Sequence, residues 1–363
     1  MLQTATSAPP SAPQPVHLTS GHLRSWVPWA ILAGSILTVL AVFGIMALAS
    51  GEGLDYGGWL ILSGILYLLL IYVISSVVEG RRKAADRFVT GLVTVAFVIA
   101  MVPLVSVAIT VVGYGVARMD AEFFTSSMRN VTGEGGGALH AIVGTLLITG
   151  AAAIISIPIG LMTAIYLVEY GRGQLARSIT FLVDVMTGIP SIVAGLFAYA
   201  VFALIFGPGV RMGFMGSVAL AVLMIPVVVR SSEEMLRLVP NELREASFAL
   251  GVPKWLTILK VVLPTSIAGI VTGIMLSIAR VIGETAPLLI TAGFTASMNY
   301  NLFEGRMNTL PVFTYNQYAN QGIPPEAYLD RAWAAALTLI LIVMVLNLVG
   351  RFVARFFAPK TNR

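Results

Sequence analysis

Long apolar stretches recur along most of this 363-residue chain and restrict what it can fold into. A helix that crosses a bilayer needs about 20 mainly apolar residues, and eight segments meet or approach that length. Only 11% of the residues are charged, less than half of the roughly 25% in a soluble domain. The sequence therefore predicts an all-α integral membrane protein and excludes a soluble enzyme. The predicted spans are Trp29–Ser50, Trp59–Val78, Phe88–Val116, Ala141–Val168, Val185–Phe206, Met212–Val229, Val261–Thr291 and Ala332–Gly350.

The distribution of basic residues predicts the orientation, because Lys and Arg concentrate in the cytoplasmic loops of membrane proteins. With the N-terminus inside, the inner segments hold 16 of the 22 Lys and Arg residues, and the outer loops hold five. We therefore expect a multi-pass protein with both termini in the cytoplasm. The inner segments are residues 1–28, 79–87, 169–184, 230–260 and 351–363.

Three regions are predicted. Residues 1–28 are rich in Pro, Ser and Gln and have no apolar run, which is typical of a disordered tail and not of a cleaved signal peptide. Residues 29–80 form a two-helix transmembrane hairpin, separated from the remainder by a basic run. Residues 88–358 form the main transmembrane domain. The hairpin contains no charge inside its spans, and we expect it to serve in packing or anchoring.

The most informative segment is the inner loop at residues 230–264, which is too polar to enter a bilayer but has helical periodicity. Gly251 breaks the pattern and Pro253 follows, as at a helix end in a helix–turn–helix. A helix this short is marginal in water by itself and needs a docking surface. Periodicity leaves two surfaces open: the protein's own membrane domain, or a groove on a soluble partner.

The loop contains a recognisable motif. Its segment EASFALG begins at Glu245 and ends at Gly251, and VVLP begins at Val261, ten positions later. These residues, at this spacing, resemble the EAA loop of bacterial ABC importer permeases. The resemblance implies a type I importer-like core in the last six spans.

Further blocks resemble, in order, the PstA-type subunit of bacterial phosphate importers, with coverage from about Phe88 to the C-terminus. The extra N-terminal hairpin is a departure from that family. The resemblance implies an inner-membrane subunit that works with a homologous PstC-type permease, a dimer of PstB-type ATPases and an external PstS-type phosphate-binding protein. The blocks are MTAIYLVEYG at 162–171, PSIVAGL at 190–196, PVVVR at 226–230, GETAPLL at 283–289 and the glycine run at 134–137.

No GxxxxGK[ST] phosphate-binding loop occurs in the chain, so ATP and Mg²⁺ are expected on a separate ATPase and no cofactor on this chain. By resemblance, Glu245, Ala246 and Gly251 belong to the element that docks on the ATPase. Gly251 is expected to adopt a left-handed backbone, which a Cβ would oppose. For Glu245, two roles stay open: contact with the ATPase, or local bracing.

Arg280 and Glu284 interrupt the seventh span four positions apart, which predicts that they share one helix face. A charged residue at this depth faces a bundle interior or a wet path. One interpretation is a buried bridge between helices. The other is a transient phosphate site, in which the Arg280 fork binds phosphate oxygens and Glu284 weakens binding enough for release.

Two further features have alternative interpretations. Arg230, at the end of the sixth span, either extends to the inner interface or, as a weaker site candidate, lines the inner mouth. The outer loops at 117–140 and 293–331 are candidates for docking an external binding protein. Interfacial anchoring is the alternative for their tyrosines, which are Tyr300, Tyr315, Tyr318 and Tyr328.

Together these features predict the transmembrane permease subunit of an ATP-driven phosphate importer, with no catalytic residue and no metal site. Two alternatives remain. One is an ABC permease for another oxyanion, such as molybdate, sulfate or phosphonate. The other is an ATP-independent carrier or channel, which would leave the EAA loop without a partner and would need more intramembrane acids than Glu284 and Asp184.

Overall fold

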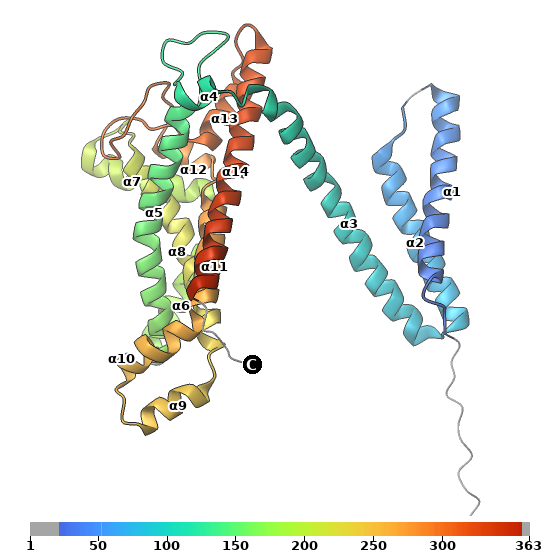
Figure 1. Ribbon diagram of the computed structural model, residues 1–363, viewed down its shortest axis with the longest axis horizontal. Helices are drawn as coiled ribbons and strands as arrows, with labels where there is room; N and C mark the ends of the chain where they lie inside the picture. Colours follow the sequence, from blue (N-terminus) through green and yellow to red (C-terminus); the bar gives the residue numbers. More distant parts are fainter. Residues whose placement is uncertain (1–21, 52, 358–363) are drawn as a thin grey trace, which may run out of the picture. The chain divides into compact units, whose positions relative to one another are not determined.

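The computed structural model describes residues 22–51 and 53–357, and within them every regular element is helical. The chain divides at residue 108 into two compact units, and the division falls inside a long helix. Figure 1 shows the helices of each unit. Most of the tail predicted at residues 1–28 lies outside the described residues, which begin at His22.

The first unit contains the predicted hairpin. Helix α1 (Val27–Ser50) packs against α2 (Tyr56–Val78), and the indole nitrogen of Trp59 donates to the Ile36 carbonyl at 3.3 Å. Helix α3 (Arg81–Gly115) follows α2 almost at once and carries the unit boundary. All three helices are long and apolar enough to cross a membrane.

A buried carboxylate holds the junction between α2 and α3. The Glu79 side chain is completely buried and accepts hydrogen bonds from Arg87 Nε at 2.6 Å and Arg87 Nη2 at 3.0 Å. The Ser75 hydroxyl and the Leu23 backbone N–H donate to it as well, each at 2.9 Å. These donors, Arg87 above all, hold the pKa of Glu79 at about 2 against the opposing effect of burial, compared with its ordinary value of 4.5.

This junction predicts an acid-sensitive hairpin. Between pH 4.5 and about 2 the unfolded chain binds a proton at Glu79 that the folded unit does not, so stability falls as pH falls through this window and is unaffected by Glu79 above it. Tryptophan fluorescence, measured with Trp255 and Trp333 replaced by Phe so that the remaining tryptophans lie in or next to the hairpin, is expected to show this slope in the otherwise wild-type chain and not in Glu79→Gln. Asp86→Asn, which changes an exposed acid on α3, is the control. Equal slopes in the wild type and Glu79→Gln would contradict the assignment.

The second unit is a helical bundle with shorter helices at both ends. Helix α3 continues into it, and α14 is its longest complete helix. The other elements are η1 (Val116–Arg118), α4 (Ala121–Thr125), α5 (Leu139–Ile165), η2 (Tyr166–Tyr170), α6 (Gly173–Thr187), α7 (Ser191–Phe206), α8 (Gly213–Arg237), α9 (Asn241–Ala249), α10 (Lys254–Thr257), η3 (Ile258–Val262), α11 (Leu263–Val281), α12 (Ala286–Thr291), α13 (Leu310–Ala319) and α14 (Pro325–Phe357).

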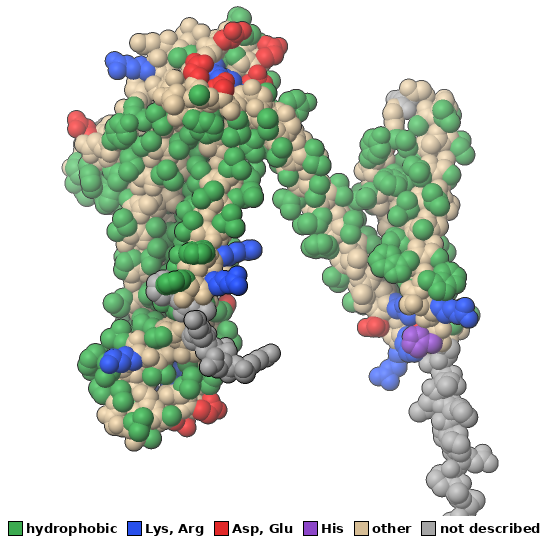
Figure 2. Space-filling model, in the orientation of Figure 1, with side chains coloured by type: hydrophobic (Ala, Val, Ile, Leu, Met, Phe, Trp, Pro, Cys, Tyr) green, Lys and Arg blue, Asp and Glu red, His purple; other side chains and the backbone are tan. Residues whose placement is uncertain are grey.

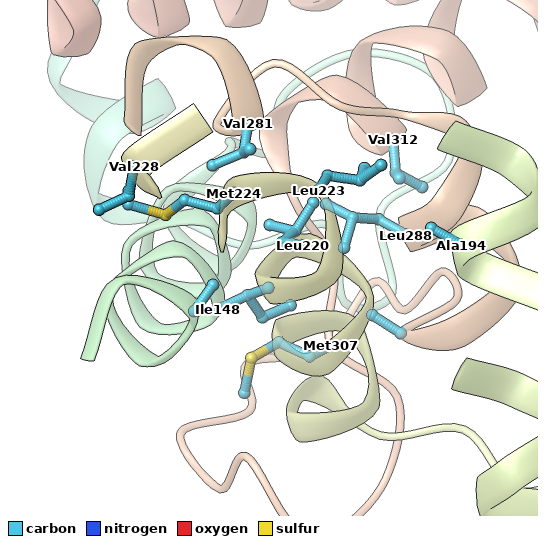
Figure 3. Close-up of a cluster of buried hydrophobic side chains, with 12 residues drawn as sticks. Ile148, Ala194, Leu220, Leu223, Met224, Val228, Val281, Leu288, Met307 and Val312 are labelled. Atoms are coloured by element: carbon cyan, nitrogen blue, oxygen red, sulfur yellow. The ribbon is translucent and has the colours of Figure 1, made fainter. Parts of the chain in front are cut away.

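Helix α8 is the centre of this bundle and packs against α5, α6, α7, α11 and α12. One apolar cluster joins α5, α7, α11 and α12 around α8, and Figure 3 shows its side chains meeting from several elements. Leu220, Met224 and Val228 of α8 are fully buried in it. In a bilayer the lipid tails are as apolar as these side chains, so it is their close packing, and not their removal from water, that fixes the position of α8.

The structure has seven helices that are long and apolar enough to span a membrane, within its described residues, and eight if one bent pair is counted as a span. Figure 2 shows hydrophobic side chains covering most of the visible helix surfaces in each unit. Two predicted spans are not continuous. Val185–Phe206 is broken after Thr187, where α6 and α7 meet at 110°. Val261–Thr291 is broken after Val281, because residues 282–285 separate α11 from α12.

Candidate translocation and coupling site

The break between α11 and α12 separates two residues that the sequence placed on one helix face. Arg280 lies in the last turn of α11 and is exposed, whereas Glu284 follows the helix and is half-buried. The expectation of a shared face is therefore wrong, because the helix ends before Glu284. Within residues 22–51 and 53–357, neither side chain has an ion-pair or hydrogen-bond partner.

Arg280 lies at the middle depth of the bundle. Helix α11 runs antiparallel to α8: a Cβ on Gly273 would lie 2.5 Å from the Ser231 hydroxyl, and one on Gly269 would meet Met235. Val281, beside Arg280 in sequence, is buried in the same cluster as Met224, near the centre of α8 (Figure 3). The exposed arginine is thus far from both ends of the helices around it.

A second helix break lies next to the first. Helix α6 ends before residues 188–190 and α7 begins after them, and these residues include Gly188 and Pro190. Proline has no backbone N–H and cannot continue a helix without a break or kink. Helix α7 packs on α12 so closely that a Cβ on Gly195 would lie 2.6 Å from the Pro287 Cα. Broken helices at membrane depth are tolerated where they line a cavity or are covered by protein.

Arg230 is held by acids from two helices, about two turns before the end of α8. Its guanidinium pairs with Asp184 of α6 and, at 2.9 Å, with Glu233 of α8. Glu233 also pairs with Arg237 at 2.5 Å. Asp184 is therefore the partner of Arg230 and not of Arg177, whose Nε donates to the Gly173 carbonyl at 3.4 Å. The Arg230 charge is neutralised within the chain, unlike that of Arg280.

The loop at residues 230–264 forms the helix pair that the sequence predicted. Gly251 ends α9 with φ of +75°, which confirms the predicted left-handed turn. The hydroxyls of Ser247 and Thr257 lie 2.8 Å apart and join α9 to the segment after the turn. Glu245 and Ala246 are exposed, and Glu245 has no hydrogen-bond or ion-pair partner in the described part of the chain. Local bracing of the loop by Glu245 is therefore not seen.

One face of this helix pair presents apolar side chains to the surface. Leu250 and Trp255 are 83% and 58% exposed, and Leu243 and Phe248 are exposed as well. Isolated exposed apolar residues are ordinary, but four of them on one short helix pair favour an interaction surface. This pattern favours a separate docking partner over the chain's own membrane domain.

The opposite face of the loop is attached to the bundle by a bridge that the sequence analysis missed. Arg244 of α9 donates through Nε and Nη2 to Glu169 Oε1 at 3.1 and 3.0 Å. The two side chains are 13% and 6% exposed. Arg244 also donates to the carbonyls of Val239 at 2.6 Å and Leu236 at 3.0 Å. Glu169 belongs to η2, which continues α5, so the bridge connects the loop to a spanning helix.

The far end of the bundle from α9 is formed by the two long loops of residues 117–140 and 293–331. Three of the four tyrosines in the second loop, Tyr300, Tyr315 and Tyr318, are 52–69% exposed. Tyr328 is half-buried, and its ring lies under the Arg331 guanidinium at 4.5 Å. Tyr328 is therefore part of the internal structure of this end, while the other three remain on its surface.

Comparison with known proteins identifies relatives of this chain. Residues 156–363 match the family described as the binding-protein-dependent transport system inner membrane component. The phosphate transport system permease protein PstA 1 of Mycobacterium tuberculosis is 47% identical over 286 residues, which cover 78% of this chain and 91% of that protein. The phosphate transport system permease protein PstA of Pasteurella multocida is 38% identical over 285 residues, covering 78% and 97%.

Solved structures show the same fold at low sequence identity. An inward-facing structure of the MetNI methionine ABC transporter covers 61% of this chain and 96% of its own, with a TM-score of 0.51 and 21% identity. A bacterial alginate ABC transporter, solved with a periplasmic protein that holds an alginate pentasaccharide, covers 77% and 97%, with a TM-score of 0.53 and 13% identity. The chain belongs to the family of binding-protein-dependent transport system inner membrane components, as a relative of the PstA permeases.

Proposed function

We propose that this chain is the transmembrane permease subunit of an ATP-driven phosphate importer. Its relatives at 38% and 47% identity carry that name over more than nine tenths of their lengths. The chain transports and has no catalytic residue of its own. It works in a bacterial inner membrane with both termini in the cytoplasm, in keeping with the excess of Lys and Arg in the segments on that side.

The observation that carries this proposal is the unpaired, exposed Arg280 at middle depth of the bundle. A lone arginine facing lipid at that depth costs about 2.5–3.5 kcal/mol on insertion scales. The helix surface around Arg280 must therefore be covered by another protein or be in contact with water. A homologous subunit of the PstC type, packed against this face, provides the cover and leaves a path between the two subunits.

The chemistry of Arg280 suits a hydrated oxyanion that must shed water to cross. Its planar fork offers parallel N–H donors to two oxygens of a phosphate. Glu284, just after the helix break, supplies a negative charge that limits how tightly the anion binds. Beyond it, Arg230 meets the anion with its charge already balanced by Asp184 and Glu233, which favours release at the inner mouth.

Energy comes from a separate ATPase dimer of the PstB type, on which ATP and Mg²⁺ bind. The exposed apolar face of α9 and α10 enters a groove on the ATPase, and Glu245 and Ala246 lie on the exposed side of α9 for contact. The sharp turn at Gly251 sets the angle between the two short helices. A PstS-type binding protein delivers phosphate to the outer loops.

The test is phosphate uptake by the reconstituted complex with Arg280→Gln. Losing a charged donor to the anion is expected to lower uptake about tenfold or more, with assembly and basal ATP hydrolysis unchanged. Arg351→Gln, at an exposed arginine near the C-terminal end of α14 that has no proposed role, is the matched control. Sulfate, molybdate and phosphonate are offered as competitors. Uptake that survives Arg280→Gln, or that another anion drives better, would overturn the assignment of residue or of substrate.

A further inference from the structure

A polar cavity of about 320 Å³ lies at the root of the helix pair α9–α10, and none of the residues proposed above for transport or ATPase contact lines it. Its walls come from the end of η2, the glycine–arginine turn after it, the end of α8 and the starts of α9 and α10. It therefore lies where the loop meets the membrane helices. A volume of this size holds about ten water molecules.

The charges around this cavity are strongly unbalanced. Arg172, Arg237, Arg244 and Lys254 line it, and Glu169 is the one carboxylate among its lining residues. Arg244 and Glu169 are recessed, with 13% and 6% of their side chains exposed. A concave site lined by one sign of charge concentrates ions of the opposite sign, so the cavity attracts anions.

The hydrogen bonds show which cations remain available. The Nε and both terminal nitrogens of Arg244 already donate, to Glu169, Val239, Leu236 and Asn241. Lys254 donates to the Glu169 backbone carbonyl and lies 4.9 Å from the centroid of the Tyr170 ring. A lysine ammonium has three donors, so two stay free. Arg172 is exposed and has no partner in the described part of the chain.

Backbone N–H groups add positive partial charge next to these cationic side chains. Helix α6 begins at Gly173, directly after Gly171 and Arg172 of the cavity wall, and no side chain caps its N-terminus. The first N–H groups of a 15-residue helix are unpaired within the helix and carry partial positive charge. They reinforce the cluster of cationic side chains at this wall.

We propose that this cavity is a binding site for a small tetrahedral oxyanion, inorganic phosphate on the side of the membrane where α9 and α10 lie. Lys254 and Arg172 donate to its oxygens, while Arg237 and Arg244, which are paired with Glu233 and Glu169, contribute charge to the wall. The recess suits a small ion better than a side chain of a docked protein. That the anion is phosphate rests on the proposed function, which supplies it at this face. The bound anion joins α10 to the turn before α6 and so fastens the loop to the membrane helices.

The test measures equilibrium binding of radiolabelled phosphate to the assembled complex, without nucleotide, in nanodiscs of phosphatidylcholine. The double variant Arg172→Gln/Lys254→Gln is expected to lose one binding site or weaken it about tenfold or more. Arg129→Gln is the matched control for loss of an exposed arginine. Arg172→Gln alone breaks no hydrogen bond or ion pair within the described part of the chain, and it is expected to weaken the same site in part even if the double variant folds poorly.

Arg280→Gln separates this site from the pathway, because it removes the proposed pathway ligand and leaves the cavity intact. Persistence of one site in Arg280→Gln, with its loss in the double variant, supports the proposal whether or not uptake confirms the pathway. Loss of all binding in Arg280→Gln, or unchanged binding in the double variant, overturns it. A repeat in nanodiscs containing phosphatidylglycerol distinguishes the two sources of phosphate: competition by the anionic lipid would assign the site to a lipid headgroup and overturn the assignment to free phosphate.

Discussion

Replacing Glu169 with Gln, or Arg244 with Met, is expected to abolish ATP-driven uptake while the ATPase subunits continue to hydrolyse ATP. These two residues form the ion pair between α9 and the end of α5, at 3.0 Å. If the ATPase moves the loop, this bridge is the polar connection through which movement of α9 reaches the end of a spanning helix, beside the hydrogen bond from Lys254 of α10 to the Glu169 carbonyl. Without it, hydrolysis proceeds and the membrane helices do not respond.

The expected effect is large because the pair is almost buried and the loop has few other supports. Removing one partner of a buried ion pair costs about 3–5 kcal/mol, since it leaves the other charge uncompensated. Helix α9 has only nine residues, and isolated helices below about 12 residues are marginal in water. The bridge therefore accounts for a large share of what holds the loop in place.

The measurement compares uptake and ATP hydrolysis in the same proteoliposomes for the wild type, both single variants and the double variant. Glu234→Gln, which removes an exposed acid from α8 outside the proposed ATPase contact, is the matched control and should behave as the wild type. The double variant should lose little beyond either single variant, because both remove the same interaction. Uptake and hydrolysis that fall together in every variant would show a loss of assembly and not of coupling.

Much of this fold follows from the sequence because apolar length and helix-breaking residues act locally. The hairpin and the break at Gly251 lie where composition and single residues predict them. The ends of α8 and α14 extend beyond the predicted spans, to Arg237 and Phe357. Polar residues continue a helix outside the apolar region, where hydropathy no longer marks its end.

The site depends on contacts that sequence spacing does not encode. Glu169 and Arg244 are 75 positions apart, and Asp184 and Arg230 are 46 apart. Arg177 is only seven positions from Asp184 in the sequence, yet Asp184 pairs with Arg230. The i, i+4 spacing of Arg280 and Glu284 predicted a shared face, and the chain leaves the helix between them because the α11–α12 turn takes over at residue 282. The predicted shared face of Arg280 and Glu284 was wrong because local spacing along the chain does not determine tertiary packing.

The second large effect, on stability, is expected at the outer end of the bundle, where one arginine is fully buried. Arg331, in the first turns of α14, has no solvent exposure. Its Nε donates to Gln317 Oε1 at 2.9 Å, and its Nη1 donates to the carbonyls of Gly133 at 2.7 Å and Gly135 at 2.9 Å. One side chain thus joins α13, α14 and the glycine loop before α5.

Replacing Arg331 with Met is expected to destabilise the second unit by about 3 kcal/mol or more, because three buried acceptors lose their donor and each costs about 1–3 kcal/mol unpaired. Arg331→Lys is not expected to restore stability, since one ammonium cannot reproduce a planar fork that reaches several acceptors and stacks on Tyr328.

The chain has no cysteine for thiol dyes, so unfolding is followed as loss of monodisperse protein after heating. Arg129→Gln, at an exposed arginine of the same loop region, should match the wild type. Full stability in Arg331→Lys would show that a point charge suffices and that the forked hydrogen bonds do not determine the fold of this end.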